Sequence, residues 1–115
     1  MKLQTYTERD SFVIALHGDL DASSSLLVDD AIQTAVKERY RQVVVDCRYL
    51  RYISSAGLGV FMSHLTELSA REIELVLFGM SMKVQDVFSI IGLDQLLTIV
   101  PTKQEAFLQC GKADR

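Results

Sequence analysis

Residues 52–65 read YISSAGLGVFMSHL and place two serines, an alanine and two glycines at the mouth of an apolar run. The run has helical spacing, and the apolar side chains that share one of its faces are Leu58, Phe61, Met62, Leu65 and Leu68. A helix that packs such a face against a core needs only one capping hydroxyl. This segment supplies a second hydroxyl at a helix start, where the backbone N–H groups favour an anion.

Strands and helices alternate on both sides of this stretch. Apolar and alternating runs predict strands at 3–7, 12–18, 42–47, 72–79 and 96–100, with Gly18 ending the second strand. Helical spacing predicts further helices at 22–40, 81–92 and 102–110, with Asp21 and the serines at 23–25 as candidate caps of the first. An opening hairpin followed by this alternation predicts one α/β domain with a mostly parallel or mixed sheet.

The carboxyl ends of parallel strands are where such sheets carry their functional loops. Three segments are expected there: GDLD at 18–21, CRYLRYISS at 47–55 and GMS at 79–81. Asp19, Asp21 and Asp46 could meet at this edge, and clustered carboxylates can hold magnesium. The simpler alternative is that Asp21 caps a helix and the other two carboxylates lie in turns.

Composition narrows the classes of function. The 115 residues are enough for one domain with a real core, and the net charge of -3 offers no basic excess for nucleic-acid phosphates. No apolar run approaches the roughly 18 residues of a membrane span, and the N-terminus lacks the apolar core of a signal peptide. We therefore predict a cytoplasmic protein without a nucleic-acid or membrane partner. Cys47 and Cys110 form no metal-binding pattern and are expected to be small buried or indifferent thiols.

Enzyme signatures are missing from the sequence. There is no nucleophile elbow, and the glycines at 57 and 59 lack the spacing of either nucleotide-binding fingerprint. His17 falls in a predicted strand and His64 in the middle of a predicted helix, where packing is a simpler role than catalysis. We predict that the protein is not an enzyme and needs no cofactor or metal.

The serine pair at the predicted helix start suggests a switch. Ser54 is placed to cap the helix, which leaves Ser55 pointing outward in the first turn. A phosphoryl group on that hydroxyl would add roughly -1.5 to -2 charges, which a helix start tolerates but a docked partner does not. Ala56, Gly57 and Gly59 are small enough for a partner backbone to approach closely. Close packing of the helix on the sheet explains the glycines equally well.

Several of these segments together resemble a known family. LHGDLD at 16–21 and VVVDCRYLRYISSAGLGVF at 43–61 are similar to the "GELD" and "DSSGLG" motifs of STAS-domain anti-sigma factor antagonists, and SIIGLDQLLTIVPTKQEA at 89–106 is similar to the C-terminal pattern of that family. The resemblance implies a single STAS domain over 1–115, with a polar tail from about residue 111. It implies a mixed sheet of about five strands with about four helices packed mainly on one face.

The resemblance also implies a function. In this family, an unphosphorylated antagonist binds an anti-sigma factor that is an ATP-dependent serine kinase, and so releases a sigma factor. The kinase then phosphorylates the antagonist, and a PP2C-type phosphatase reverses the modification. Ser55 matches the phosphorylated serine, while Ser54 replaces the motif aspartate and is a secondary candidate acceptor. The partner surface carried over from the motifs comprises Asp19, Asp21, Ser54, Ala56, Gly57, Leu58 and Gly59.

Other interpretations remain open at this point. The chain could be a STAS scaffold in a larger signalling complex, or a module that binds a small ligand. It could also be a receiver-like phosphotransfer domain that uses Asp46 with help from Asp19, Asp21 and Lys103. The basic run KERYR at 37–41 is either a solvated face or a partner surface, since arginine and tyrosine are enriched at interfaces.

Overall fold

The computed structural model describes the backbone of residues 1–113 and the side chains of residues 1–108. The strands are β1 (Lys2–Glu8), β2 (Ser11–Leu20), β3 (Gln42–Ile53), β4 (Glu74–Phe78) and β5 (Thr98–Val100). The helices are α1 (Ser25–Lys37), α2 (Ser55–Ala70), α3 (Met82–Ile90), the short 3-10 turn η1 (Leu93–Gln95) and α4 (Lys103–Ala113). The side chain of Cys110 and the end of the expected polar tail lie outside the described residues. No helix in the described part is long and apolar enough to span a membrane.

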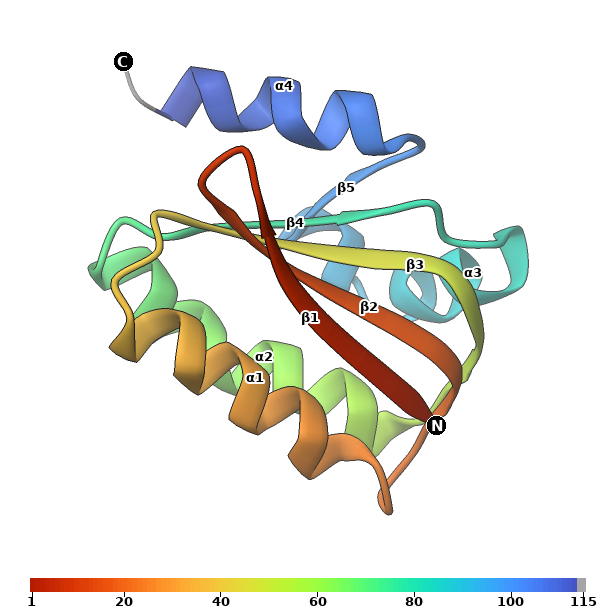
Figure 1. The fold of residues 1–115 in the computed structure, drawn as a ribbon. Helices are drawn as coiled ribbons and strands as arrows, with labels where there is room; N and C mark the ends of the chain where they lie inside the picture. The colour runs from red at the N-terminus through yellow and green to blue at the C-terminus, as the bar shows by residue number, and fades with distance from the viewer. Residues whose placement is uncertain (114–115) are drawn as a thin grey trace.

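The strands form one mixed sheet in the order β1-β2-β3-β4-β5. β1 pairs antiparallel with β2, and the three remaining pairings are parallel. Three helices, α1, α2 and α3, contribute to the larger core on one face, whereas α4 covers the other face alone (Figure 1). The predicted α/β class, the mixed sheet and the unequal covering of its faces are therefore confirmed.

The apolar centre of β3 follows from this two-sided covering. Val43 and Val45 face the large core under the helices, and Val44 faces the small core under α4. All three are fully buried, because each side of the strand has a layer against it. The alternation of polar and apolar residues appears only where one face of a sheet meets water, so it is absent here.

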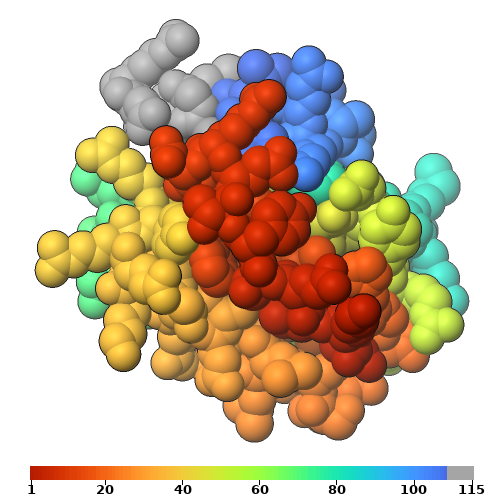
Figure 2. Space-filling view, viewed as in Figure 1, coloured from red at the N-terminus to blue at the C-terminus, as the bar shows by residue number. Residues whose placement is uncertain are grey.

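The fourth helix is anchored to the opening hairpin. Lys103 Nζ lies 2.7 Å from Glu8 Oε1, and the Arg9 guanidinium lies 5.4 Å from the centre of the Phe107 ring. Figure 2 shows the tip of the hairpin and α4 side by side on the surface of the molecule. These contacts close one end of the sheet face that α1, α2 and α3 leave uncovered.

Two expected strand ends are wrong. β3 continues to Ile53 instead of stopping at Cys47, and β2 passes through Gly18 to Leu20. The two strands stay paired because irregularities in the register absorb extra residues, and Leu20 finally lies opposite Ile53. Most of the expected loops at 18–21 and 47–55 is therefore strand. As a result, α2 begins directly beyond the end of β3.

The apolar stripe of α2 is narrower than predicted. Phe61 is fully buried, but Met62 is half exposed, because it lies one helical step away from the face that meets the sheet. Phe61 also faces Phe88 of α3, with ring centres 6.4 Å apart. The helix is therefore anchored by its inner row alone.

Replacement of this anchor tests the packing. We expect Phe61→Ala to lower the free energy of unfolding by about 3–5 kcal/mol, because it leaves a cavity between α2, α3 and the sheet. Its neighbour Met62 provides the control, because Met62→Ala should change the free energy of unfolding by less than about 1 kcal/mol. Urea denaturation of both variants measures the difference. Equal losses would contradict the assigned helix face.

Candidate functional site

Ser54 joins β3 to α2 and is the N-cap of that helix. Its backbone is extended, and its Oγ accepts a hydrogen bond from the Gly57 N–H at 3.3 Å. Its own N–H donates to the Leu20 carbonyl at the end of β2, with N and O 2.9 Å apart. Ser54 is therefore hydrogen-bonded through its side chain to the start of α2 and through its backbone to the end of β2.

Ser55 is the first residue of α2 and is exposed, as is Ala56 beside it. Among the described residues, none forms a hydrogen bond with the Ser55 hydroxyl. The group lies where the first N–H groups of the helix leave a partial positive charge. A hydroxyl in this position is accessible, and a negative group attached to it would be tolerated by the helix.

Two residues of the GLG segment face inward. A methyl group on Gly57 would lie 2.7 Å from Leu20 Cγ and 3.1 Å from the Leu20 carbonyl oxygen, so this glycine lets the helix approach β2. Leu58 is also buried. Gly59, in contrast, is exposed and has nothing within 4 Å of the equivalent position. Close packing therefore explains Gly57, and the surface above it consists of Ser55, Ala56 and Gly59.

The GDLD segment lies next to this helix start. Asp19 is half exposed, and its Oδ1 lies 3.6 Å from Arg51 Nε. Asp21 Oδ1 accepts hydrogen bonds from the Ser23 N–H at 3.0 Å and the Ser23 hydroxyl at 2.6 Å. The bond from the Ser23 side chain is the main reason that the pKa of Asp21 is lowered. Asp21 orders the turn, and Ser24 rather than Asp21 is the N-cap residue of α1.

Asp19, Asp21 and the serine pair thus meet at one edge of the sheet. Pairing between β2 and β3 places Asp19 opposite Tyr52, two residues before Ser54. The Leu20 carbonyl then bonds to Ser54, so the turn after β2 and the start of α2 form one continuous surface. The sequence-derived partner residues are brought together there, with Gly57 and Leu58 beneath the surface rather than on it.

Asp19 and Asp46 lie in β2 and β3, so the alternative that placed both in turns is wrong. Asp46 is also remote from Asp19 and Asp21, so the cluster that the sequence left open does not form. Asp46 pairs with Ala15 and is six residues before Tyr52 along β3, which separates it from Asp19 by about 20 Å. Within the part of the chain that the structure describes, no group of three His, Cys, Asp or Glu side chains could hold a metal ion. The magnesium site and the receiver-like use of these carboxylates are not supported by the geometry.

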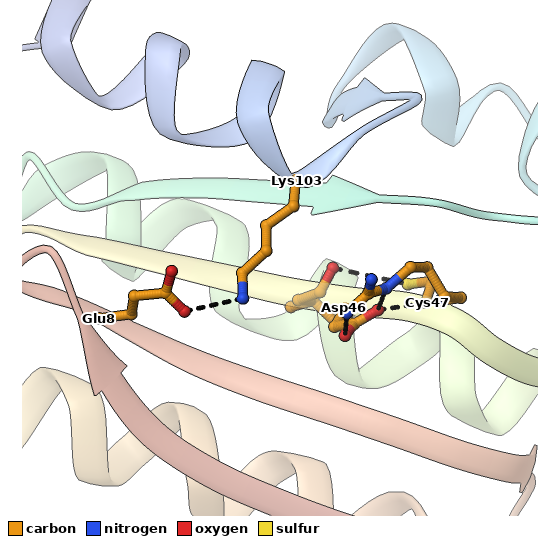
Figure 3. Close-up of polar contacts among 6 residues, drawn as sticks. Glu8, Asp46, Cys47 and Lys103 are labelled. Carbon is orange, nitrogen blue, oxygen red and sulfur yellow. Dashed lines mark hydrogen bonds and ion pairs between the residues drawn. The ribbon is translucent and has the colours of Figure 1, made fainter.

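The Asp46 carboxylate is instead closed off by Arg48. The Arg48 Nε and Nη2 atoms donate to its two oxygens at 3.0 and 2.8 Å, and the Arg48 backbone N–H donates to it at 3.0 Å. Burial by itself would raise the pKa of Asp46, but these bonds outweigh it and leave the pKa below its ordinary value of 3.8. Lys103 reaches Glu8 rather than Asp46, as Figure 3 shows.

The remaining candidates have structural roles. His17 stacks on Tyr49 with ring centres 4.9 Å apart, as a packed strand residue. His64 is buried, and its Nε2 lies 2.6 Å from Asp29 Oδ1 across the α1–α2 interface. Cys47 is buried as expected, and burial raises the pKa of its thiol, so it stays protonated. The contact of Asp29 with His64 had no signal in the sequence, because 35 positions separate the two residues.

Comparisons with known proteins agree with this architecture. The family pattern of the STAS domain matches residues 2–106. The anti-sigma-B factor antagonist of Listeria monocytogenes is 32% identical over 92 residues, which cover 80% of this chain and 81% of that relative. The structure of the anti-sigma factor antagonist SpoIIAA in its unphosphorylated form has a TM-score of 0.81 and 25% identity, covering 96% of this chain and 97% of that one. Bacillus SpoIIAA in its phosphorylated form shares the fold, with a TM-score of 0.73, 24% identity and coverage of 95% and 99%.

The mixed sheet of five strands with three helices on one face and one on the other is the architecture of a STAS domain. The chain belongs to the STAS-domain family and, within it, to the anti-sigma factor antagonists.

The two glycines of the helix start form a matched pair for mutagenesis. We expect Gly57→Ala to lower the free energy of unfolding by about 1–3 kcal/mol, because the added methyl group meets the Leu20 backbone and pushes α2 away from β2. Gly59→Ala should be neutral or stabilising by up to about 1 kcal/mol, because its methyl group enters open space in a helix. Chemical denaturation of both variants gives the comparison. A neutral Gly57→Ala would contradict the close contact.

The lowered pKa of Asp46 predicts how the stability of the fold depends on pH. Because its folded-state pKa is lowered, its contribution is complete well above pH 3.8 and is lost as the pH falls through the lower folded-state value. We expect Asp46→Asn to be less stable than the wild type by about 1–3 kcal/mol at pH 7. The difference should shrink toward zero in strongly acidic solution. Denaturation curves collected across this pH range test the sign, and a difference that grows on acidification would refute it.

Proposed function

We propose that this protein is a partner-switching antagonist whose unphosphorylated form binds a serine-kinase anti-sigma factor, and that phosphorylation of Ser55 ends the binding. The observation that carries the proposal is the division of roles between the two serines. Ser54 is occupied as the cap of α2, whereas Ser55 is exposed on the first turn. In this role the protein is the substrate of the kinase and not itself an enzyme.

Electrostatics supports the direction of the switch. A phosphoryl group on Ser55 would carry roughly -1.5 to -2 charges at neutral pH. The exposed N–H groups and dipole of α2 would accommodate this charge, so the fold is expected to survive. A partner that covers Ser55 would have to desolvate a strongly hydrated anion, which is unfavourable unless the partner supplies its own cations. Binding is therefore lost while the structure is retained.

The surrounding surface suits a protein partner. Asp19 at the end of β2 and Asp21 in the turn that follows lie at the same edge of the sheet as Ser55, and Ala56 and Gly59 add no bulk that would keep a partner backbone away. The relatives named anti-sigma-B factor antagonists support an anti-sigma factor as that partner. A PP2C-type phosphatase that removes the phosphate from Ser55 would complete the cycle. The proposal needs no bound cofactor.

Charge at Ser55 can be tested directly. We expect Ser55→Asp to bind the host's kinase-type anti-sigma factor at least about tenfold more weakly than the wild type, a loss of about 1.4 kcal/mol. Ser55→Ala should bind as the wild type does, because the hydroxyl has no structural bond to lose. Titration calorimetry with the purified partner measures both affinities. Wild-type affinity in Ser55→Asp would rule out the charge mechanism.

Ser54→Ala and phosphosite mapping complete this test. Ser54→Ala should lose about 1 kcal/mol of stability, because the helix cap is removed, and still be phosphorylated on Ser55. Mass spectrometry of protein isolated from the host locates the phosphate. A phosphate on Ser54 alone would keep the mechanism but move the acceptor. A protein that stays unmodified through growth and stress would favour a scaffold or a ligand-binding module instead.

A further inference from the structure

A second surface lies at the opposite end of α2 from Ser55. Both α1 and α2 start at the carboxyl edge of the sheet and end together at its other edge (Figure 1). The 16 residues of α2 separate the two ends by about 24 Å. Two adjoining hollows of about 450 and 280 Å³ lie there, and they share Val36, Arg39 and Arg71 as lining residues. Together they form an elongated groove across the helix ends.

The charge of this groove is opposite to that of the protein. Four cations line it, namely Lys37, Arg39, Arg41 and Arg71, against the single carboxylate of Glu67, whose Oε2 lies 3.4 Å from Arg71 Nε. The whole chain has 12 basic and 15 acidic residues, so the balance of charge is reversed in this groove. The neighbouring acidic residues Glu38 and Glu72 line neither hollow. The groove is therefore complementary to negative charge.

Only some of the basic residues in this groove can be explained by the ordinary preference for cations at the C-terminal ends of helices. Lys37 lies in the last turn of α1 and Arg71 caps the end of α2, so both offset the negative ends of the helix dipoles. Arg39 lies in the connection to β3, outside both helices, and is not needed to offset either dipole. Arg39 also has a φ of 63°, a left-handed conformation in which glycine is the usual residue after a helix. An arginine is present there although the backbone favours a residue without a side chain.

The floor of the groove is apolar and held in place. Val36, Tyr40 and Ile73 line it, and the Tyr40 ring packs on Phe12 with ring centres 5.0 Å apart. The Tyr40 hydroxyl is bonded to Thr7 Oγ1 at 2.6 Å. A groove with a rigid apolar floor and a cationic rim suits a chain segment that carries both apolar and acidic side chains. A lone inorganic anion would use only the rim.

We propose that this groove binds an extended acidic peptide segment of a protein partner. Carboxylates of the segment pair with Arg39 and Arg71, while its apolar side chains lie over Val36 and Ile73. Because the groove is about 24 Å from Ser55 and the screening length in the cell is about 8 Å, a phosphate on Ser55 leaves it unaffected. A partner held there stays attached while the Ser55 surface is switched on or off, which goes beyond the proposed function.

The test uses the full chain and a defined probe. A fluorescent peptide of about ten residues with alternating Glu and Val is long enough to span the groove, and its Gln/Val counterpart is the neutral control. Fluorescence anisotropy is expected to show that the protein binds the acidic peptide and does not bind the neutral one. Raising the salt from about 50 to 300 mM should weaken binding of the acidic peptide severalfold, because the contacts are ionic. Failure of the acidic peptide to bind, or equal binding of the neutral one, would overturn the proposal.

Matched variants locate the site. The double variant Arg39→Gln with Arg71→Gln should bind at least tenfold more weakly. The control Lys2→Gln with Lys83→Gln removes the same charge from exposed positions elsewhere and should stay within twofold of the wild type. Equal losses of affinity in both double variants would show that binding depends only on the net charge of the protein, and would overturn the proposal. So would displacement of the peptide by inorganic phosphate at constant ionic strength, which would identify a small-anion site.

Two further measurements separate this proposal from the first. Amide chemical-shift changes in the wild type should be confined to residues 33–41 and 64–73, and changes centred on residues 19–21 and 54–59 would contradict the groove. This result does not depend on the folding of any variant. Ser55→Asp should bind the peptide as the wild type does, and the Arg39 and Arg71 double variant should keep its Ser55-dependent switch. Each of the two proposals can therefore be refuted without affecting the other.

Discussion

The contact between the end of β2 and the start of α2 is the constraint on which the site depends. The Leu20 carbonyl accepts the Ser54 N–H, and Gly57 allows the helix to lie against the Leu20 side chain. Any other residue at position 57 would push the helix start away from the sheet. Because of this contact, the end of β2 with Asp19, the turn with Asp21 and the first turn of α2 with Ser55 form one surface.

The two ends of α2 have different electrostatic characters. At its N-terminal end, unpaired N–H groups and the helix dipole tolerate a negative group on Ser55. At its C-terminal end, Arg71 joins Arg39 in a cationic groove that lies outside the range of a screened charge on Ser55. Under the two proposals, a single helix supports a surface that a phosphate on Ser55 switches and a second surface that this phosphate leaves unaffected. The separation is a consequence of helix length.

Two polar pairs, Asp46 with Arg48 and His64 with Asp29, stabilise the fold. Asp46 is matched by Arg48 through three hydrogen bonds, and Gly79 leaves the room that the Arg48 side chain occupies. His64 of α2 and Asp29 of α1 connect these two helices on the larger core face. Each pair satisfies groups that would be unfavourable if they were buried alone. These pairings account for the positions of residues whose types also occur in active sites.

Local patterns along the chain were sufficient to predict the order of strands and helices, the mixed sheet and the exposed Ser55. These features depend on hydrophobic periodicity and on capping, which act between residues close together in the sequence. The length of β3 was missed, because the pairing of Leu20 with Ile53 outweighs the polar character of residues 48–52. The same pairing keeps Asp46 far from Asp19, and the packing of Gly57 depends on a side chain 37 positions earlier. The cationic groove likewise exists only because α1 and α2 end side by side, an arrangement that no local pattern in the sequence contains.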